Sequence, residues 1–136
     1  MTGPAIVVDF DGTICEHQFP DVGPPKMGVK EALERFRQLG LRIIIHSVRT
    51  ASYWREAAKQ DPSLDPDRQA QLIRNYMAEH QLPFDEILMA DKPLAIAYID
   101  DNAIRFEDNW WEITQAIEQH VRVMGGAPQS NARRKT

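Results

Sequence analysis

Cysteine is almost absent from this chain of 136 residues, in which Cys15 is the only one. A single cysteine excludes an internal disulfide and predicts a reducing, cytoplasmic setting. No histidine with a partner acid marks Cys15 as a nucleophile, so we expect it to be a small packing residue. Long apolar runs are lacking as well, and we therefore expect neither a membrane span nor a signal peptide.

Positive charge is slightly outnumbered by negative charge. The chain has 16 Lys and Arg against 20 Asp and Glu, a net charge of −4, so it has no basic footprint for nucleic acid. The basic residues that stand out are Arg133, Arg134 and Lys135, which follow a glycine pair and a polar stretch. We expect residues 125–136 to form a disordered basic tail and residues 1–124 to form one domain.

The apolar pattern alternates between strands and helices. Short β-branched runs predict strands at residues 5–8, 41–45, 86–89 and 94–99, with residues 104–106 as the candidate for a fifth. Helical spacing predicts helices over residues 28–39, 54–60, 66–81 and 110–121. This order indicates an α/β fold: a three-layer, Rossmann-like parallel sheet with helices on both faces and ligands at the carboxyl ends of the strands.

Two acids follow the first predicted strand. Asp9 and Asp11 are one residue apart, so in an extended chain their side chains point the same way and their charges repel. A divalent cation with oxygen ligands, most plausibly Mg²⁺, is the simplest compensation. Gly12 permits a sharp turn that brings backbone N–H groups toward an anion. The competing interpretation is an ordinary Asp-Gly turn.

The other predicted strands also end in polar side chains. Ser47 follows the second strand, Lys92 follows the third, and Asp100 and Asp101 follow the fourth. Acids, a hydroxyl and a lysine on one edge are suited to phosphoryl transfer, because a carboxylate attacks phosphorus while a cation and the lysine neutralise phosphate charge. Arg49, two residues past the hydroxyl, is a further candidate for an anion contact.

At these positions the chain resembles the haloacid dehalogenase-like (HAD) hydrolase superfamily. The first motif of that superfamily matches residues 7–13 (VVDFDGT), the second matches residues 43–47 (IIIHS), the third matches Lys92 and the fourth matches residues 98–101 (YIDD). Four motifs in order are a far more specific signal than one. Lys92 precedes Asp100 by few residues for the superfamily at large, but this spacing resembles a compact subgroup with Lys-Pro before Tyr-Ile-Asp-Asp. Lys26 is the next candidate for the lysine.

The resemblance implies a role for each residue. Asp9 would be the nucleophile that forms an aspartyl-phosphate, and Asp11 the general acid that then activates water. Ser47 would bind the phosphate, and Lys92 would neutralise charge on it and on Asp9.

The resemblance also implies a Mg²⁺ site. Asp9, the backbone carbonyl of Asp11, and Asp100 would hold the ion, with Asp101 close by. The leading hypothesis is therefore a Mg²⁺-dependent phosphatase that acts on a phosphorylated small molecule.

The two places where the superfamily inserts a cap domain are short here, which predicts a capless member with an open site. A neighbouring subunit in a homo-oligomer is one way of covering such a site. The first of these places, residues 14–27, contains three prolines and predicts a loop or flap. Its candidates for contact with a substrate are Glu16, His17, Phe19 and Lys26.

Three alternatives stay open. A phosphotransferase or dehalogenase has the same fold, although an acid at Asp11 suits an alcohol leaving group and not a halide. A phospho-acceptor signalling domain also combines acids, a hydroxyl and a lysine, but its acid pair is adjacent and its acceptor lies on a middle strand. A binding or assembly protein that keeps the fold is the third, because fold alone does not fix function.

Overall fold

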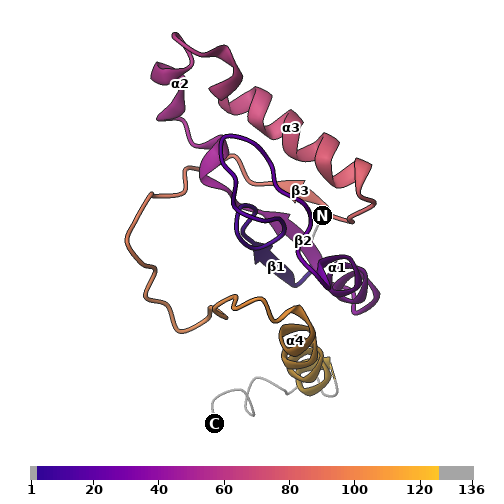
Figure 1. The fold of residues 1–136 in the computed structure, drawn as a ribbon. Coiled ribbons are helices and arrows are strands. Elements are labelled where there is room, and N and C mark those ends of the chain that lie inside the picture. Colours follow the sequence, from indigo (N-terminus) through magenta and orange to yellow (C-terminus); the bar gives the residue numbers. More distant parts are fainter. Residues whose placement is uncertain (1–2, 126–136) are drawn as a thin grey trace.

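The computed structural model describes residues 3–125, so the predicted basic tail lies outside the described residues apart from its first position. The elements follow one another as β1 (Ala5–Val8), α1 (Val29–Gln38), β2 (Arg42–Ile45), the 3-10 turn η1 (Val48–Thr50), α2 (Trp54–Ala57), the 3-10 turn η2 (Pro62–Leu64), α3 (Pro66–Glu79), β3 (Glu86–Ile87) and α4 (Trp110–Gly125). Figure 1 shows these elements along the chain.

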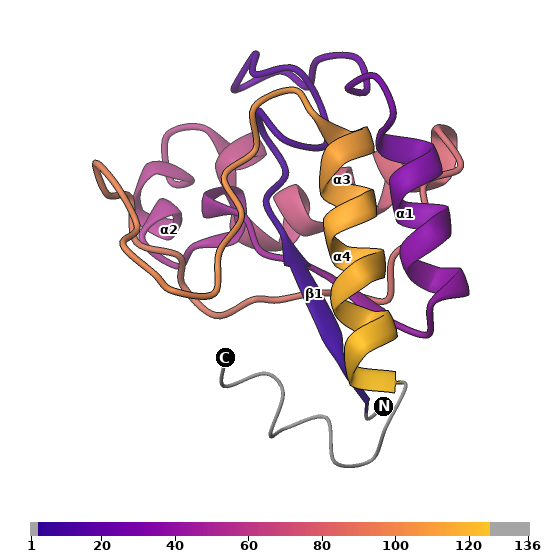
Figure 2. The same ribbon diagram turned by 90° about the horizontal axis from the view of Figure 1, so that it is seen from below.

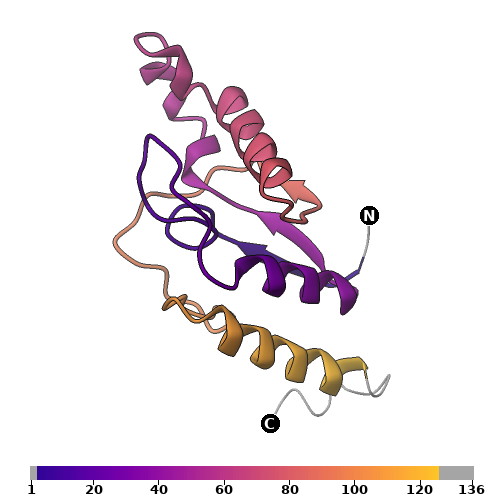
Figure 3. The ribbon, with the colours of Figure 1, turned by 45° about the vertical axis from the view of Figure 1, so that its right-hand side comes forward.

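The strands form one small parallel sheet in the order β1-β2-β3. In the pairing of β1 with β2, Val8 lies opposite Ile45, so both strands end at the same edge, as the strand-helix-strand pattern predicts. Figure 3 shows α3 on one side of the strands and α1 and α4 on the other. The fold is therefore α/β and compatible with a Rossmann-like arrangement, although three short strands make a small sheet.

The predicted fourth and fifth strands are wrong. Residues 94–99 and 104–106 form no strand, and in Figures 1 and 2 this part of the chain bows outward as an extended loop. Its large apolar side chains are exposed, namely those of Leu94, Ile96, Tyr98, Ile99 and Ile104. An apolar β-branched run indicates a strand only where it meets a partner, and a sequence pattern does not identify that partner. Strand β1 consequently pairs on one edge only, and Val7 on it is 61% exposed.

The predicted helices exist, and the expected residues mark the end of α1 and the start of α3. Helix α1 buries Val29, Leu33 and Phe36, and Gly40 just past its end adopts the left-handed conformation at φ +83°. Helix α3 begins at Pro66, where the Asp65 side chain accepts hydrogen bonds from two backbone N–H groups. Helix α2 is shorter than predicted, at four residues.

Helix α4, at the end of the described chain, contacts elements near the beginning of the chain. It packs beside α1, where Arg35 makes a two-pronged ion pair with Glu118 at 3.0 and 2.8 Å. At the other end of α4, the Trp110 indole N–H donates to the Thr13 carbonyl at 3.0 Å, in the turn that follows β1. No helix among residues 3–125 is both long and apolar enough to cross a membrane.

Candidate active site

The turn after β1 carries the two acids. Gly12 has φ +80°, which explains the need for glycine there, and its N–H donates to the Cys15 carbonyl at 2.8 Å. The Thr13 N–H donates to the Phe10 carbonyl at 3.2 Å. These two N–H groups are therefore used within the turn and do not point at an anion, contrary to the expectation from the sequence.

Asp9 is the accessible acid of the pair. Its side chain is 41% exposed, and its carboxylate accepts from the Lys92 ammonium at 2.9 Å on Oδ1 and from the Thr13 hydroxyl at 3.3 Å on Oδ2. Lys92 also donates to the His46 carbonyl at 3.2 Å. The structure thus brings together the predicted nucleophile and the predicted lysine, from segments 83 residues apart.

Lys92 is positioned by contacts of the residues just before it. A hydrogen bond of 2.9 Å joins His46 Nε2 and the Ala90 carbonyl. The Asp91 carboxylate accepts from the Ser52 hydroxyl at 2.6 Å and from the Ser52 N–H at 2.8 Å. These bonds from Ser52 lower the pKa of Asp91 below its usual value. The loop after β3 is therefore attached to the loop after β2, which directs Lys92 toward Asp9.

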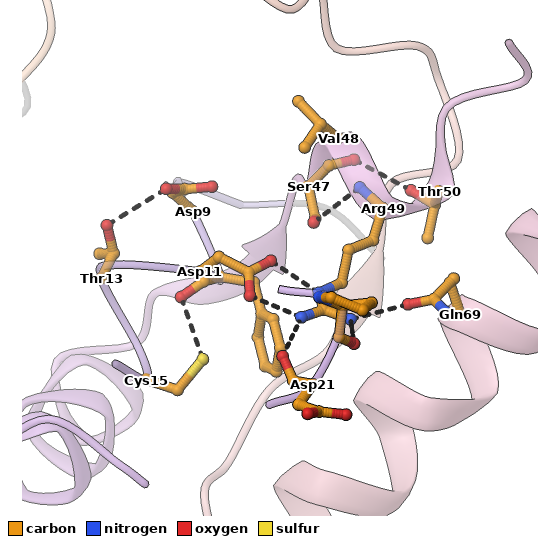
Figure 4. A network of polar contacts seen from close by, with 12 residues as sticks. Asp9, Asp11, Thr13, Cys15, Asp21, Ser47, Val48, Arg49, Thr50 and Gln69 are labelled. Carbon is orange, nitrogen blue, oxygen red and sulfur yellow. Dashed lines mark hydrogen bonds and ion pairs between the residues drawn. The ribbon is translucent and has the colours of Figure 1, made fainter. Parts of the chain in front are cut away.

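Asp11 has a different partner. Its side chain is 9% exposed, and Arg49 donates two hydrogen bonds to its carboxylate, from Nε to Oδ2 at 2.6 Å and from Nη2 to Oδ1 at 2.8 Å. Figure 4 shows the guanidinium facing the Asp11 carboxylate, with Asp9 turned toward Thr13. Each acid thus has its own basic side chain, so Lys92 and Arg49 compensate the repulsion for which the sequence suggested a metal ion.

Arg49, which the sequence suggests as an anion contact, has no donor left for a substrate anion in this structure. The side chain is fully buried, and its remaining donors are also occupied: Nη1 donates to the Pro20 carbonyl at 3.1 Å and to Gln69 Oε1 at 2.9 Å, and Nη2 donates to the Asp21 carbonyl at 2.7 Å. A guanidinium has five N–H groups, and all five have acceptors here. The residue type alone suggests anion binding. Nothing in the sequence indicated that Gln69 and two backbone carbonyls would accept the hydrogen bonds of Arg49.

Ser47 follows β2 by two residues and is buried. Its side chain is 1% exposed, and its hydroxyl oxygen accepts the Arg49 backbone N–H at 3.0 Å, which caps η1. The preceding residue, His46, donates its N–H to the Val8 carbonyl at 3.0 Å and so extends the pairing of β1 with β2. Ser47 therefore follows the sheet edge that carries Asp9, as the sequence predicts.

Asp100 and Asp101 lie apart from this cluster. Both are exposed in the loop of residues 94–104, and Asp100 accepts the Asn102 N–H at 2.8 Å. Within residues 3–125, no hydrogen bond or ion pair links either acid to Asp9 or Asp11. In the same range, no group of three or more His, Cys, Asp or Glu side chains is placed to hold a metal ion. The predicted set of Mg²⁺ ligands is not assembled in this arrangement.

Other candidates have structural roles. Lys26, the alternative lysine, pairs with Asp108 at 2.6 Å and with Glu16 at 3.4 Å, both outside the cluster around Asp9. Cys15 is a buried packing residue, as predicted. Burial, and after it the nearby Asp11 carboxylate, raise the pKa of its thiol to about 11.

Comparison with known proteins gives two structural neighbours. A target protein from Vibrio cholerae, known from a crystal structure, is 28% identical with a TM-score of 0.61, and the match covers 88% of this chain and 98% of that one. A conserved protein from Bacteroides thetaiotaomicron is 25% identical with a TM-score of 0.53, and the match covers 88% of this chain and 93% of that one. No protein-family model and no curated protein matches. The names of both neighbours state no activity, so the likeness supports the fold.

Proposed function

We propose that this protein is a phosphatase that hydrolyses phosphate monoesters of small molecules through an aspartyl-phosphate on Asp9. The observation that carries this proposal is the 2.9 Å contact between Asp9 and Lys92, two residues that the chain brings together from the ends of β1 and β3. An exposed carboxylate beside a held ammonium is suited to attack on a phosphate, because the lysine attracts the anion and balances its charge.

The first chemical step forms a bond from an Asp9 carboxylate oxygen to phosphorus and breaks the bond from phosphorus to the leaving oxygen. Asp11 is the proposed proton donor to that oxygen, which leaves as an alcohol; for this role Asp11 has to leave Arg49, which donates to both of its oxygens in this structure. Lys92 lies close enough to Asp9 to neutralise charge on the phosphoryl group during the transfer.

The second step regenerates the enzyme. A water molecule attacks the phosphorus of the aspartyl-phosphate, Asp11 accepts the proton of that water, and the bond to Asp9 breaks to release inorganic phosphate. In this scheme Ser47 holds a phosphate oxygen, for which it has to become accessible, since it is 1% exposed in this structure.

Mg²⁺ remains part of the proposal because the sequence motifs imply it. The cluster as it stands does not fit the ion, since both Asp11 oxygens bind Arg49, both Asp9 oxygens have protein donors, and Asp100 and Asp101 lie elsewhere. Bound Mg²⁺ would supply charge neutralisation at the phosphate. The same proposal includes three further expectations. They are a cytoplasmic setting, a homo-oligomer that covers the open site, and the finer fold of a three-layer, capless HAD-like domain.

The test is phosphate release from an activated aryl phosphate and from a panel of phosphorylated metabolites, with Mg²⁺ or with a chelator. Asp9→Asn keeps the side-chain volume and removes the nucleophile, so we expect it to abolish release and the phosphoryl adduct seen by mass spectrometry. Asp67→Asn, at an acid whose side chain is 72% exposed, is the matched control. Near-normal release by Asp9→Asn would overturn the proposal. A long-lived adduct without turnover would favour a phospho-acceptor domain.

A further inference from the structure

Four aromatic side chains lie beside the candidate active site. They come from three segments: Phe19 from the loop before α1, Tyr53 and Trp54 from the start of α2, and Tyr98 from the loop after β3. Tyr53 is 45% exposed and Tyr98 is 55% exposed, whereas Phe19 and Trp54 are partly buried. The two exposed rings have no role in the mechanism proposed above.

The ring of Tyr98 lies next to the lysine of the site. Lys92 Nζ, which donates to Asp9 at 2.9 Å, is 5.8 Å from the centroid of the Tyr98 ring. The Tyr98 hydroxyl donates to the Pro93 carbonyl, so this part of the loop turns back toward the lysine. An anion that binds Lys92 therefore has the Tyr98 ring as a neighbouring surface.

Tyr53 is held next to the same loop. Its neighbour Ser52 donates two hydrogen bonds to Asp91, the residue before Lys92. Partial burial and, after it, the nearby Tyr98 and Asp91 raise the pKa of the Tyr53 phenol. Both exposed tyrosines consequently border the loop that carries the lysine.

The two partly buried rings support Tyr53. The Trp54 ring is 5.7 Å from the Tyr53 ring and 5.5 Å from the Phe19 ring between centroids. The Trp54 indole N–H donates to the Val48 carbonyl at 2.8 Å, and the Phe19 ring lies 4.8 Å from the guanidinium carbon of the buried Arg49. Rings that are already held in place lose little conformational entropy when a flat ligand binds to them.

We propose that Tyr53 and Tyr98 form an aromatic platform for the substrate, and that this substrate is a phosphate monoester whose alcohol part carries a planar ring. This inference rests on the phosphatase function proposed above. With the phosphate at Asp9 and Lys92, the planar ring stacks on the tyrosines, because aromatic faces attract aromatic and nucleobase rings. A plain sugar or alkyl phosphate gains only the contacts at Asp9 and Lys92. Either a nucleobase or an aryl group supplies such a ring.

The test compares kcat/KM within two pairs of substrates, with Mg²⁺ present. Adenosine 5′-monophosphate and ribose 5-phosphate share the sugar and the leaving oxygen and differ by the base. Benzyl phosphate and cyclohexylmethyl phosphate differ by the planarity of the ring. We expect a preference for the planar member of about 10-fold in at least one pair, within the effect known for stacking on one aromatic side chain. A preference in the first pair alone identifies a nucleoside, and one in the second pair alone identifies an aryl alcohol. Equal kcat/KM within both pairs would overturn the proposal.

Tyr53→Leu and Tyr98→Leu each remove a ring and keep an apolar side chain. We expect each to lower kcat/KM for the favoured planar substrate by about 10-fold and to leave its non-planar counterpart within about 2-fold. Trp111→Leu, at an aromatic side chain on α4 that is 54% exposed, is the matched control and should change neither value. Circular dichroism checks the fold of each variant. Equal losses for both members of a pair, or a ring preference that survives both substitutions, would contradict the platform.

Binding without turnover separates failure of this inference from failure of the phosphatase proposal. Calorimetric titration of Asp9→Asn with each member of the two pairs measures Kd in a protein that lacks the nucleophile. We expect the planar member to bind about 10-fold more tightly, and this difference to be lost when Tyr53→Leu is added. If wild type releases phosphate from no compound but this difference is found, the phosphatase proposal fails while the platform stands. If phosphate is released but the Kd values are equal, the platform fails and the phosphatase proposal stands.

Discussion

Asp11 and Arg49 form a two-pronged ion pair in which Nε lies 2.6 Å from Oδ2 and Nη2 lies 2.8 Å from Oδ1. The arginine side chain is fully buried and the carboxylate is nearly so. We therefore expect the pair to contribute to the stability of the fold as well as to lie beside the nucleophile. Removing one partner would leave the other as a buried charge with unsatisfied hydrogen bonds.

We therefore predict that Arg49→Met lowers the free energy of unfolding by about 3–5 kcal/mol, the cost of breaking a buried ion pair. Urea denaturation of wild type and variant measures it. The control is Arg55→Met, whose arginine is exposed and 3.6 Å from Asp65, and which should change the free energy of unfolding by less than about 1 kcal/mol. Equal effects of the two variants would contradict the importance of the buried pair.

Lys92→Met should lower phosphate release by about 100-fold or more, because it removes the charge beside the attacking carboxylate. Steady-state assays with the best substrate of the panel measure the loss, and circular dichroism checks the fold. Lys59→Met is the control, since that lysine is 71% exposed and pairs with Glu56 at 3.0 Å. Activity of the Lys92 variant within a few-fold of wild type would remove Lys92 from the mechanism.

Ser52→Ala should raise the pKa of Asp91 toward its usual value of 3.8, because the Ser52 hydroxyl is the largest cause of the lowered value. A carboxyl pKa that is lower in the folded state stabilises the protein above the unfolded pKa, near pH 4, and this contribution is lost as the pH falls through the folded pKa. A carboxyl NMR titration measures the shift. Ser63→Ala, which removes a hydroxyl that bonds Asp61, should leave Asp91 unchanged.

Cys15 should resist thiol reagents in the folded protein. Its side chain is fully buried and its thiol pKa is raised to about 11, so at pH 8 little thiolate exists and access is blocked. Labelling by a chromogenic disulfide reagent should follow unfolding and become rapid in denaturant. Fast labelling without denaturant would show that the turn after β1 opens readily.

The sequence predicted those parts of the site that depend on strand ends. Asp9 and Ser47 follow paired strands, and the carboxyl ends of parallel strands share an edge, so local pattern and topology together placed them. Lys92 was placed by its motif, and the structure adds how Ser52 and His46 hold its loop. Gly40 and Pro66 likewise marked the end of α1 and the start of α3, because their backbone limits are local.

Other parts depend on contacts that no local pattern contains. The five acceptors of Arg49 come from three separate segments and include two backbone carbonyls, which carry no residue-type signal. Residues 94–99 have the composition of a strand but no partner in the sheet, so propensity alone gave the wrong structure there.

The hydrogen bond from Trp110 to the Thr13 carbonyl also has a consequence for how the protein is made. It spans 97 residues, and α1 likewise packs against α4. A ribosome delivers the N-terminal part first, so β1 and its acid turn emerge long before their last support has been translated. Nascent chains that end before about residue 110 should therefore expose Phe36. In the finished protein its ring contacts the Trp110 ring, with 6.2 Å between the centroids. The acid turn therefore gains the hydrogen bond from Trp110 only when the start of α4 has been synthesised.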